Sequence, residues 1–172
     1  MEYLLLLIPL AIFAVVYIFR PEKPFSAPDV SPIDARDLRA FEKAPSLFVN
    51  ANEAGLFNHL RDRLPPEFHI HSKVRLEDII RVKHKGLSEK ARWAARGRVK
   101  SRHVDYLITN RAGHILLAIE LDGRSHNPKN PSEADKIKTA LFKSVGVPLK
   151  RILVGEDFHL IADTIVTELK RS

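Results

Sequence analysis

Two short β-type runs joined by a tight turn constrain the fold of this chain more than any other feature. The runs are Val104 to Thr109 and His114 to Leu121, and the four residues between them end in Gly113. Glycine supplies the positive φ that a tight turn requires. We therefore predict an antiparallel hairpin.

Three acidic residues lie where a buried strand ordinarily has none. Asp105 is near the start of the first run, and Glu120 and Asp122 follow the apolar part of the second run. Side chains alternate along a strand, so Glu120 and Asp122 point the same way and the hairpin brings Asp105 beside them. Clustered acids are costly unless a cation or a proton neutralises them, and Mg²⁺ favours one or two carboxylates plus waters and a phosphate. Either these acids form a metal site, or they lie exposed at the strand ends.

The surrounding sequence predicts a small mixed β-sheet flanked by helices, an α/β fold over residues 47–172. We expect helices over 50–63, 76–82, 88–96, 132–146 and 158–169, with Gly97 ending the third of them, and strands over 68–74 and 149–154. The helix over 132–146 is a crossover long enough to join two parallel strands. Glu53 lies in the first turn of the first helix, where a carboxylate interacts favourably with the helix dipole.

The N-terminal region predicts a membrane anchor. Residues 3–19 carry no charge and, at ~1.5 Å per residue, reach about 25 Å, near the lower limit for a bilayer core. A signal peptide is the alternative, but a basic n-region and a cleavage site are absent. Arg20 and Lys23 follow the run, so the positive-inside rule places the remaining chain on the cytoplasmic side of the inner membrane. Residues 21–46 hold five of the eleven prolines and indicate a linker, within which we expect a short helix over 34–43.

Basic residues are concentrated between Arg81 and Arg102. This segment has nine basic residues and one acid, within a chain of net charge +7, and is a candidate surface for nucleic acid or anionic lipid. The candidate nucleic-acid-binding residues are Lys90, Arg92, Arg96, Arg98, Lys100 and Arg102. Trp93, among them, either stacks on a base or anchors the helix to the core.

Several short motifs, taken in order, resemble a known superfamily. They are a helix with Glu53, a strand with HVD at 103–105, a strand ending ELDGRSH at 120–126, a helix with Asp135 and Lys136 in its first turn, and GVPLKRI at 146–152. This series resembles the restriction-endonuclease-like, or PD-(D/E)xK, superfamily. More closely, it is similar to domain of unknown function 2726, a bacterial family related to very-short-patch-repair-like endonucleases.

The resemblance implies a Mg²⁺-dependent nuclease, with Mn²⁺ as a substitute, that acts on nucleic acid, DNA being favoured over RNA. By position, Asp105 and Glu120 correspond to metal ligands, Leu121 to a backbone carbonyl ligand, and Glu53 to a carboxylate that orients water. The superfamily lysine belongs at the position of Asp122, so another group must replace it. Lys136 or Lys138 would serve if either reaches back from the crossover helix; otherwise both are solvated.

Two further residues complete the prediction. His126 follows the acids in a Gly- and Pro-flanked loop and is a candidate general acid or base, since an imidazole titrates near neutrality. Arg151 either faces the same site or pairs with one of its acids. We thus expect a membrane-anchored nuclease. The alternatives are an inactive nucleic-acid-binding module of the same fold and a membrane scaffold that binds anionic lipid and a protein partner.

Overall fold

The computed structural model describes residues 37–83, 85–123 and 131–171, and the chain divides into two units, 1–45 and 46–172. The first unit contains a 3-10 helix, η1 (Asp37–Ala40). Within the described part of 34–43, where a short helix was expected, this single turn is the helical segment. The expected membrane span over 3–19 lies outside the described residues. None of the helices within the described ranges is long and apolar enough to cross a membrane.

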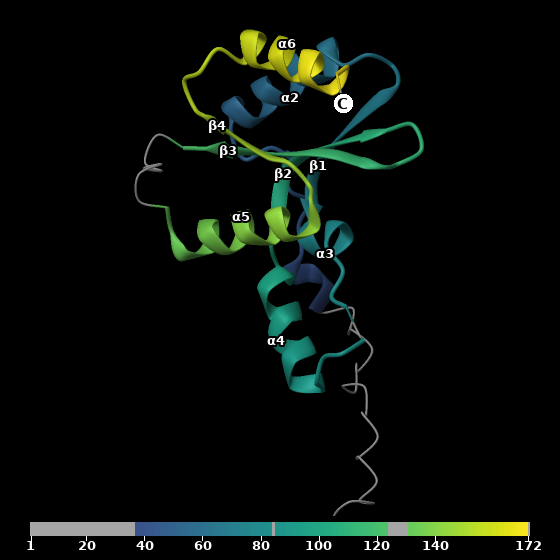
Figure 1. The fold of residues 1–172 in the computed structure, drawn as a ribbon. Coiled ribbons are helices and arrows are strands. Elements are labelled where there is room, and N and C mark those ends of the chain that lie inside the picture. The colour runs from purple at the N-terminus through teal and green to yellow at the C-terminus, as the bar shows by residue number, and fades with distance from the viewer. Residues whose placement is uncertain (1–36, 84, 124–130, 172) are drawn as a thin grey trace, which may run out of the picture. The chain divides into compact units, whose positions relative to one another are not determined.

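The second unit is built on a four-stranded mixed sheet in the order β1-β2-β3-β4 (Figure 1). The strands are β1 (Phe68–Arg75), β2 (His103–Asn110), β3 (Ile115–Asp122) and β4 (Leu149–Leu153). The first three form antiparallel pairs, whereas β4 pairs with β3 in parallel. This arrangement confirms the expected hairpin and the expected parallel pair.

Five helices of the second unit complete the described elements: α2 (Ala51–Arg63), α3 (Leu76–Ile79), α4 (Glu89–Val99), α5 (Glu133–Val145) and α6 (Phe158–Leu169). Figure 1 shows α2 and α6 on one side of the sheet and α5 and α3 on the other. The fold is therefore a layered α/β arrangement in which α5 carries the chain from β3 to β4.

A hydrophobic core fills the space on each face of the sheet. On the first face, Leu56 and Leu60 of α2 and Ile165 of α6 pack against Tyr106 and Ile119. The second core joins α3, α4 and α5 to the same strands through Leu76, Val99, Leu107, Ala118 and Phe142. Neighbouring residues from Tyr106 to Ile108 and from Leu117 to Ile119 therefore belong to opposite cores, as the period of a strand requires.

Local sequence signals account for most helix ends. Ser132 and Asp135 form a capping box at the start of α5, and Gly146 ends this helix at a φ of 72°, which glycine adopts without strain.

Two expectations about the helices were wrong. Helix α4 continues through Gly97 to Val99, and α3 is one turn long rather than reaching Val82.

Candidate functional site

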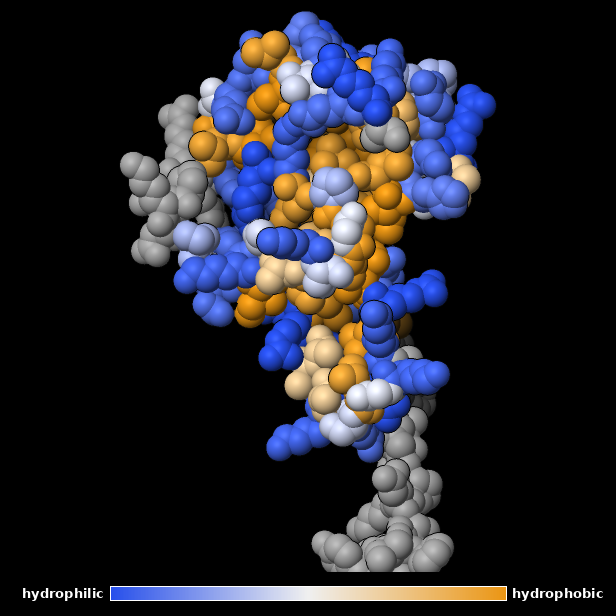
Figure 2. Space-filling model, viewed as in Figure 1, coloured by the Kyte–Doolittle hydropathy of each residue, from blue (hydrophilic) through white to orange (hydrophobic). Residues whose placement is uncertain are grey.

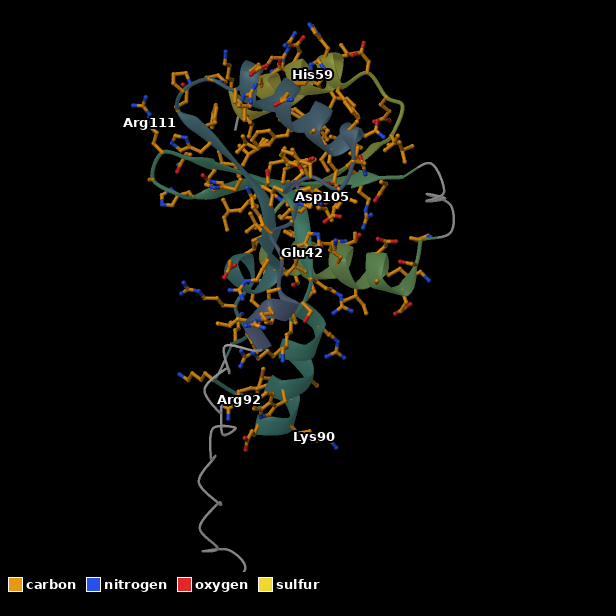
Figure 3. All side chains as sticks on the ribbon, turned by 180° about the vertical axis from the view of Figure 1, so that it is seen from behind. Glu42, His59, Lys90, Arg92, Asp105 and Arg111 are labelled. Atoms are coloured by element: carbon orange, nitrogen blue, oxygen red, sulfur yellow. The ribbon has the colours of Figure 1, made fainter. Side chains whose placement is uncertain are left out.

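Asp105 and Glu120 come together on neighbouring strands. The β2–β3 register pairs Tyr106 with Ile119, and one step further along both strands reaches these two acids. Asp105 Oδ2 accepts a hydrogen bond from the backbone N–H of Leu121 at 2.9 Å. The two side chains are only 13% and 11% exposed, so the alternative in which the acids are solvated at the strand ends is wrong. Figure 3 shows Asp105 within the sheet.

Lys73 of β1 joins Asp105 to the helix acid. Its ammonium nitrogen lies 2.9 Å from Asp105 Oδ1 and 3.0 Å from Glu53 Oε1, and its side chain is 18% exposed. The backbone of Lys73 has a φ of 54°, a left-handed conformation inside a strand. Such a conformation is strained for a residue with a side chain, and strain of this kind clusters at functional sites. Sequence reasoning missed Lys73, and its only signal was the polar interruption in an otherwise alternating strand.

Glu53 has two roles at the start of α2. Its Oε2 accepts a hydrogen bond from the backbone N–H of Val49 at 3.0 Å, which closes the helix N-terminus together with Asn50. Its Oε1 faces Lys73. The Tyr106 hydroxyl donates to the backbone carbonyl of Glu53 at 2.8 Å. Burial, with the nearby carboxylates of Asp105 and Glu53, raises the pKa of Tyr106, so this hydroxyl keeps its proton. Glu53 therefore caps the helix with one carboxylate oxygen and faces Lys73, beside Asp105, with the other.

Glu120 is the most buried acid of the site. Its Oε1 accepts a hydrogen bond from Lys138 Nζ of α5 at 2.7 Å, and the same ammonium donates to the backbone carbonyl of His103 at 3.0 Å. Burial raises the pKa of Glu120 to about 7, against the opposing effect of Lys138. Lys136, in contrast, is 57% exposed and lies 4.0 Å from Glu133. Of the two candidate lysines, Lys138 is the one that reaches the acids.

Arg151 of β4 completes the network. It donates two hydrogen bonds to Asp122, at 3.1 and 3.0 Å, and its other terminal nitrogen lies 3.2 Å from Asp135 Oδ1. Hydrogen bonds from Ser132 lower the pKa of Asp135, with a further effect of Arg151. The prediction that Arg151 pairs with an acid is confirmed, and Asp122 is the acid that it holds.

The charges of this network are unequal. It consists of three groups: Glu53 and Asp105 share Lys73, Glu120 pairs with Lys138, and Asp122 and Asp135 share Arg151. The acids exceed the bases by two negative charges when all groups are ionised. Within the described residues no group of three or more His, Asp or Glu side chains is gathered as metal ligands. Asp105 and Glu120 offer carboxylates, the ligand type that Mg²⁺ uses, and each is paired with a lysine in the structure. His126 lies outside the described residues.

The predicted nucleic-acid-binding residues lie elsewhere. Lys90, Arg92, Arg96 and Arg98 belong to α4, and Lys100 caps its C-terminal end. Arg102 donates to the backbone carbonyls of Gly97 and Arg98 at 3.2 and 2.8 Å. Figure 3 shows Lys90 and Arg92 well apart from Asp105. The structure therefore does not bring the basic helix and the acids into one site.

The fold and the site define an α/β protein in which lysine and arginine side chains bridge a half-buried group of carboxylates at one end of a mixed sheet. Comparison with protein families identifies the family of the chain. Residues 46–169 match the family described as protein of unknown function (DUF2726), and the chain belongs to this family. Similar searches of curated proteins and of solved structures give no match.

Proposed function

We propose that the chain is a divalent-metal-dependent phosphodiesterase acting on nucleic acid, of the restriction-endonuclease-like superfamily. The observation that carries the proposal is the proximity of three acids from a helix and two strands. Glu53 and Asp105 share Lys73, and burial together with the nearby Asp105 carboxylate raises the pKa of Glu120. Acids from different elements are costly to gather without a cation that uses them. Without such a cation, the excess charge is relieved only by protonation, as the raised pKa of Glu120 indicates.

In this proposal Asp105 and Glu120 hold Mg²⁺, with the backbone carbonyl of Leu121 as a further ligand. When bound, Mg²⁺ supplies charge neutralisation of the phosphate and lowers the pKa of the attacking water. Lys138 takes the part of the lysine missing at Asp122, because its ammonium already contacts Glu120 at 2.7 Å. Lys73 orients Glu53 and Asp105 between its two ion pairs, which fixes the direction of both carboxylates.

Proton transfer falls to a group that titrates near neutrality. Glu120 is ionised while it holds the metal in this proposal, so it does not transfer the proton. His126 remains the proposed acid or base of the loop that follows the acids. Asp122 is proposed as a positioning residue, because its two hydrogen bonds with Arg151 tie the end of β3 to β4.

A second function is favoured by a different observation. The strand acids are each paired with a base: Asp105 with Lys73, Glu120 with Lys138, and Asp122 with Arg151. Ammonium groups in place of a metal would suit a module that binds nucleic acid without cleaving it. The charge excess favours the enzyme over this module.

A cleavage assay separates the two functions. The compact unit 46–172, which contains both hydrophobic cores, would be incubated with plasmid, single-stranded DNA and RNA in Mg²⁺, Mn²⁺ or EDTA. We expect metal-dependent cutting that Asp105→Asn and Glu120→Gln abolish. Asp62→Asn is the matched control, because Asp62 is 58% exposed and pairs with the neighbouring Arg61. Salt-sensitive binding without cutting would instead establish the module.

We also propose that residues 3–19 anchor the chain in the cytoplasmic membrane, with 46–172 on the cytoplasmic side. The uncharged run and the basic residues that follow it support this proposal. Membrane fractionation should find the full chain in the membrane and a chain without residues 1–20 in the soluble fraction. A truncated chain that stays with the membrane would point to lipid binding by the basic segment, the third hypothesis.

A further inference from the structure

Trp93 stands at the surface rather than in the core. Its side chain is 54% exposed, whereas Val99 is the buried residue that fastens α4 to the second core. The indole N–H donates to Glu89 Oε1 at 3.4 Å, one turn earlier on the same helix. The alternative in which Trp93 anchors the helix is therefore wrong. A large aromatic ring left at the surface marks an interaction site when its surroundings form one.

The surroundings do form one. Trp93 lines a hollow of about 630 Å³ between α4 and the segment 77–82, which is the end of α3 and the residues after it; its apolar walls include Ile80, Val82 and Val99. This volume lies in the range of small-molecule sites and exceeds what a single base occupies. Residues from two segments thus build a concave surface with an exposed aromatic face.

The hollow also carries a net positive charge. Arg81, Arg92 and Arg96 line it against Glu77 and Glu89, within a stretch of chain rich in basic residues. The guanidinium of Arg96 lies over the indole, 6.0 Å from the ring centroid, and its Nε donates to Glu77 at 3.1 Å. An aromatic face beside guanidinium groups suits a ligand with both a π-face and negative charge. Nucleotides have both.

We infer that this hollow binds single-stranded nucleic acid, with an unstacked base on the Trp93 indole and the neighbouring phosphates paired with the arginines. Bases of a duplex are stacked on each other and have no free face for an indole in a hollow. An anionic membrane is the less favoured partner. Apart from Trp93, α4 has only alanines and Val99 as apolar residues, too little surface for insertion. In Figure 2 the region of α4 shows hydrophilic side chains with apolar ones between them.

The inference rests on the proposed function in one respect, that the partner is nucleic acid. The location of the site does not depend on that function. The acids of the network belong to the sheet, α2 and α5, and the hollow belongs to α4 and the segment 77–82. Loss of cleavage in Asp105→Asn with binding intact would therefore separate the two sites. If the wild-type chain binds the oligonucleotide but does not cleave nucleic acid, the nuclease proposal fails and the inferred binding site is unaffected.

Trp93 is the sole tryptophan of the chain, so intrinsic fluorescence reports this site alone. The full chain in neutral detergent and EDTA would be titrated with a short deoxythymidine oligonucleotide and with a duplex of equal length. We expect the oligonucleotide to quench Trp93 emission and to bind more tightly than the duplex. Trp93→Ala should weaken binding about tenfold, the effect of losing one stacked base, and Trp93→Phe should keep it within about threefold.

Two arginines provide a matched comparison. Arg92→Ala removes one charge at the hollow, and Arg111→Ala removes one charge at the turn between β2 and β3, far from it in Figure 3. We expect Arg92→Ala to weaken binding several-fold and to reduce the slope of log affinity against log salt by about 0.7, as for one lost phosphate contact. Arg111→Ala should change neither quantity.

Three results would overturn the inference. They are binding without quenching, equal affinity of the wild-type chain and Trp93→Ala for the oligonucleotide, and equal effects of the two arginine substitutions. Anionic phosphatidylserine vesicles that shift Trp93 emission, with no response to oligonucleotide, would identify a membrane surface instead. Because quenching is measured on the wild-type chain, a variant that failed to fold would not leave the question open.

Discussion

Lys73 shows how the site depends on a single strained residue. Its φ of 54° turns the strand locally, so that its ammonium lies between Glu53 and Asp105, from α2 and β2. Neither contact was predictable from neighbouring sequence, because each joins segments that only the folded sheet brings together. Asp105 and Glu120, in contrast, could be placed together from the sequence, since a tight hairpin fixes which residues face each other.

Substitutions of Lys73 separate its charge from its conformation. Lys73→Ala should destabilise the unit by about 2 kcal/mol and Lys73→Gly by about 1 kcal/mol, because both leave two largely buried carboxylates without their cation. Glycine adopts a positive φ without strain, so Lys73→Gly should be more stable than Lys73→Ala by about 1 kcal/mol. Urea unfolding of 46–172 measures both differences. An alanine variant as stable as the glycine variant would show that the backbone of Lys73 is not strained.

Glu120 predicts a pH dependence of stability. Burial raises its pKa to about 7 in the folded chain, while the unfolded value is near 4.5. Between these values the folded chain holds the proton and the unfolded chain does not, so stability falls as pH rises, and the loss is complete above pH ~7. From pH ~5 to pH ~8 the wild type should lose about 2 kcal/mol relative to Glu120→Gln. If the two chains differed in free energy of unfolding by the same amount at both pH values, the raised pKa of Glu120 would be contradicted.

At the scale of elements, local signals predict helix ends better than helix interruptions. The helix over 158–169 and the α5 helix with its Ser132 cap and its C-terminal Gly146 match the sequence prediction. Gly97 did not end α4, because glycine lowers helix propensity by only about 1 kcal/mol and the buried contact of Val99 lies beyond it. Tertiary burial thus outweighed a local preference.

Two glycines test this account of helix α4. Nothing lies within 4 Å of a Cβ added at Gly97 or at Gly146, and the two differ in that Gly146 has a φ of 72°. Gly97→Ala should stabilise the chain by about 0.5 to 1 kcal/mol, because alanine favours the helix. Gly146→Ala should destabilise it by about 1 kcal/mol, because alanine is strained there. Thermal unfolding that moves in the same direction for both would contradict the structure of α4.

At the scale of the whole molecule, the chain separates into parts with different roles. Both hydrophobic cores and the complete acid network lie within residues 46–172. Removal of residues 1–45 should therefore leave the melting temperature of this unit unchanged within about 2 °C, well under the shift that a 1 kcal/mol loss produces in a domain of this size. Calorimetry of both chains in the same detergent provides the comparison. A large fall in melting temperature would show that the first unit stabilises the second.

The family relationship and the sheet could be anticipated from ordered motifs, whereas the chemistry of the site could not. Asp122 stands where a lysine was expected, and the lysine that contacts Glu120 is Lys138, far along the chain. Of the two candidate lysines, only the packing of α5 against the sheet distinguishes Lys138 from Lys136. The packing of the crossover helix decides where its charged side chains lie, and no short sequence motif encodes that packing.

Direct measurement of metal binding tests the central claim, that Asp105 and Glu120 form a divalent-cation site. Titration of the full chain with Mn²⁺, followed by the loss of the free-ion electron paramagnetic resonance signal, counts the ions bound. We predict one bound Mn²⁺ that Mg²⁺ displaces, that Asp105→Asn removes, and that the exposed control Asp62→Asn leaves in place. Failure to bind Mn²⁺, or binding that survives Asp105→Asn unchanged, would contradict the claim and leave the acids as partners of their lysines alone.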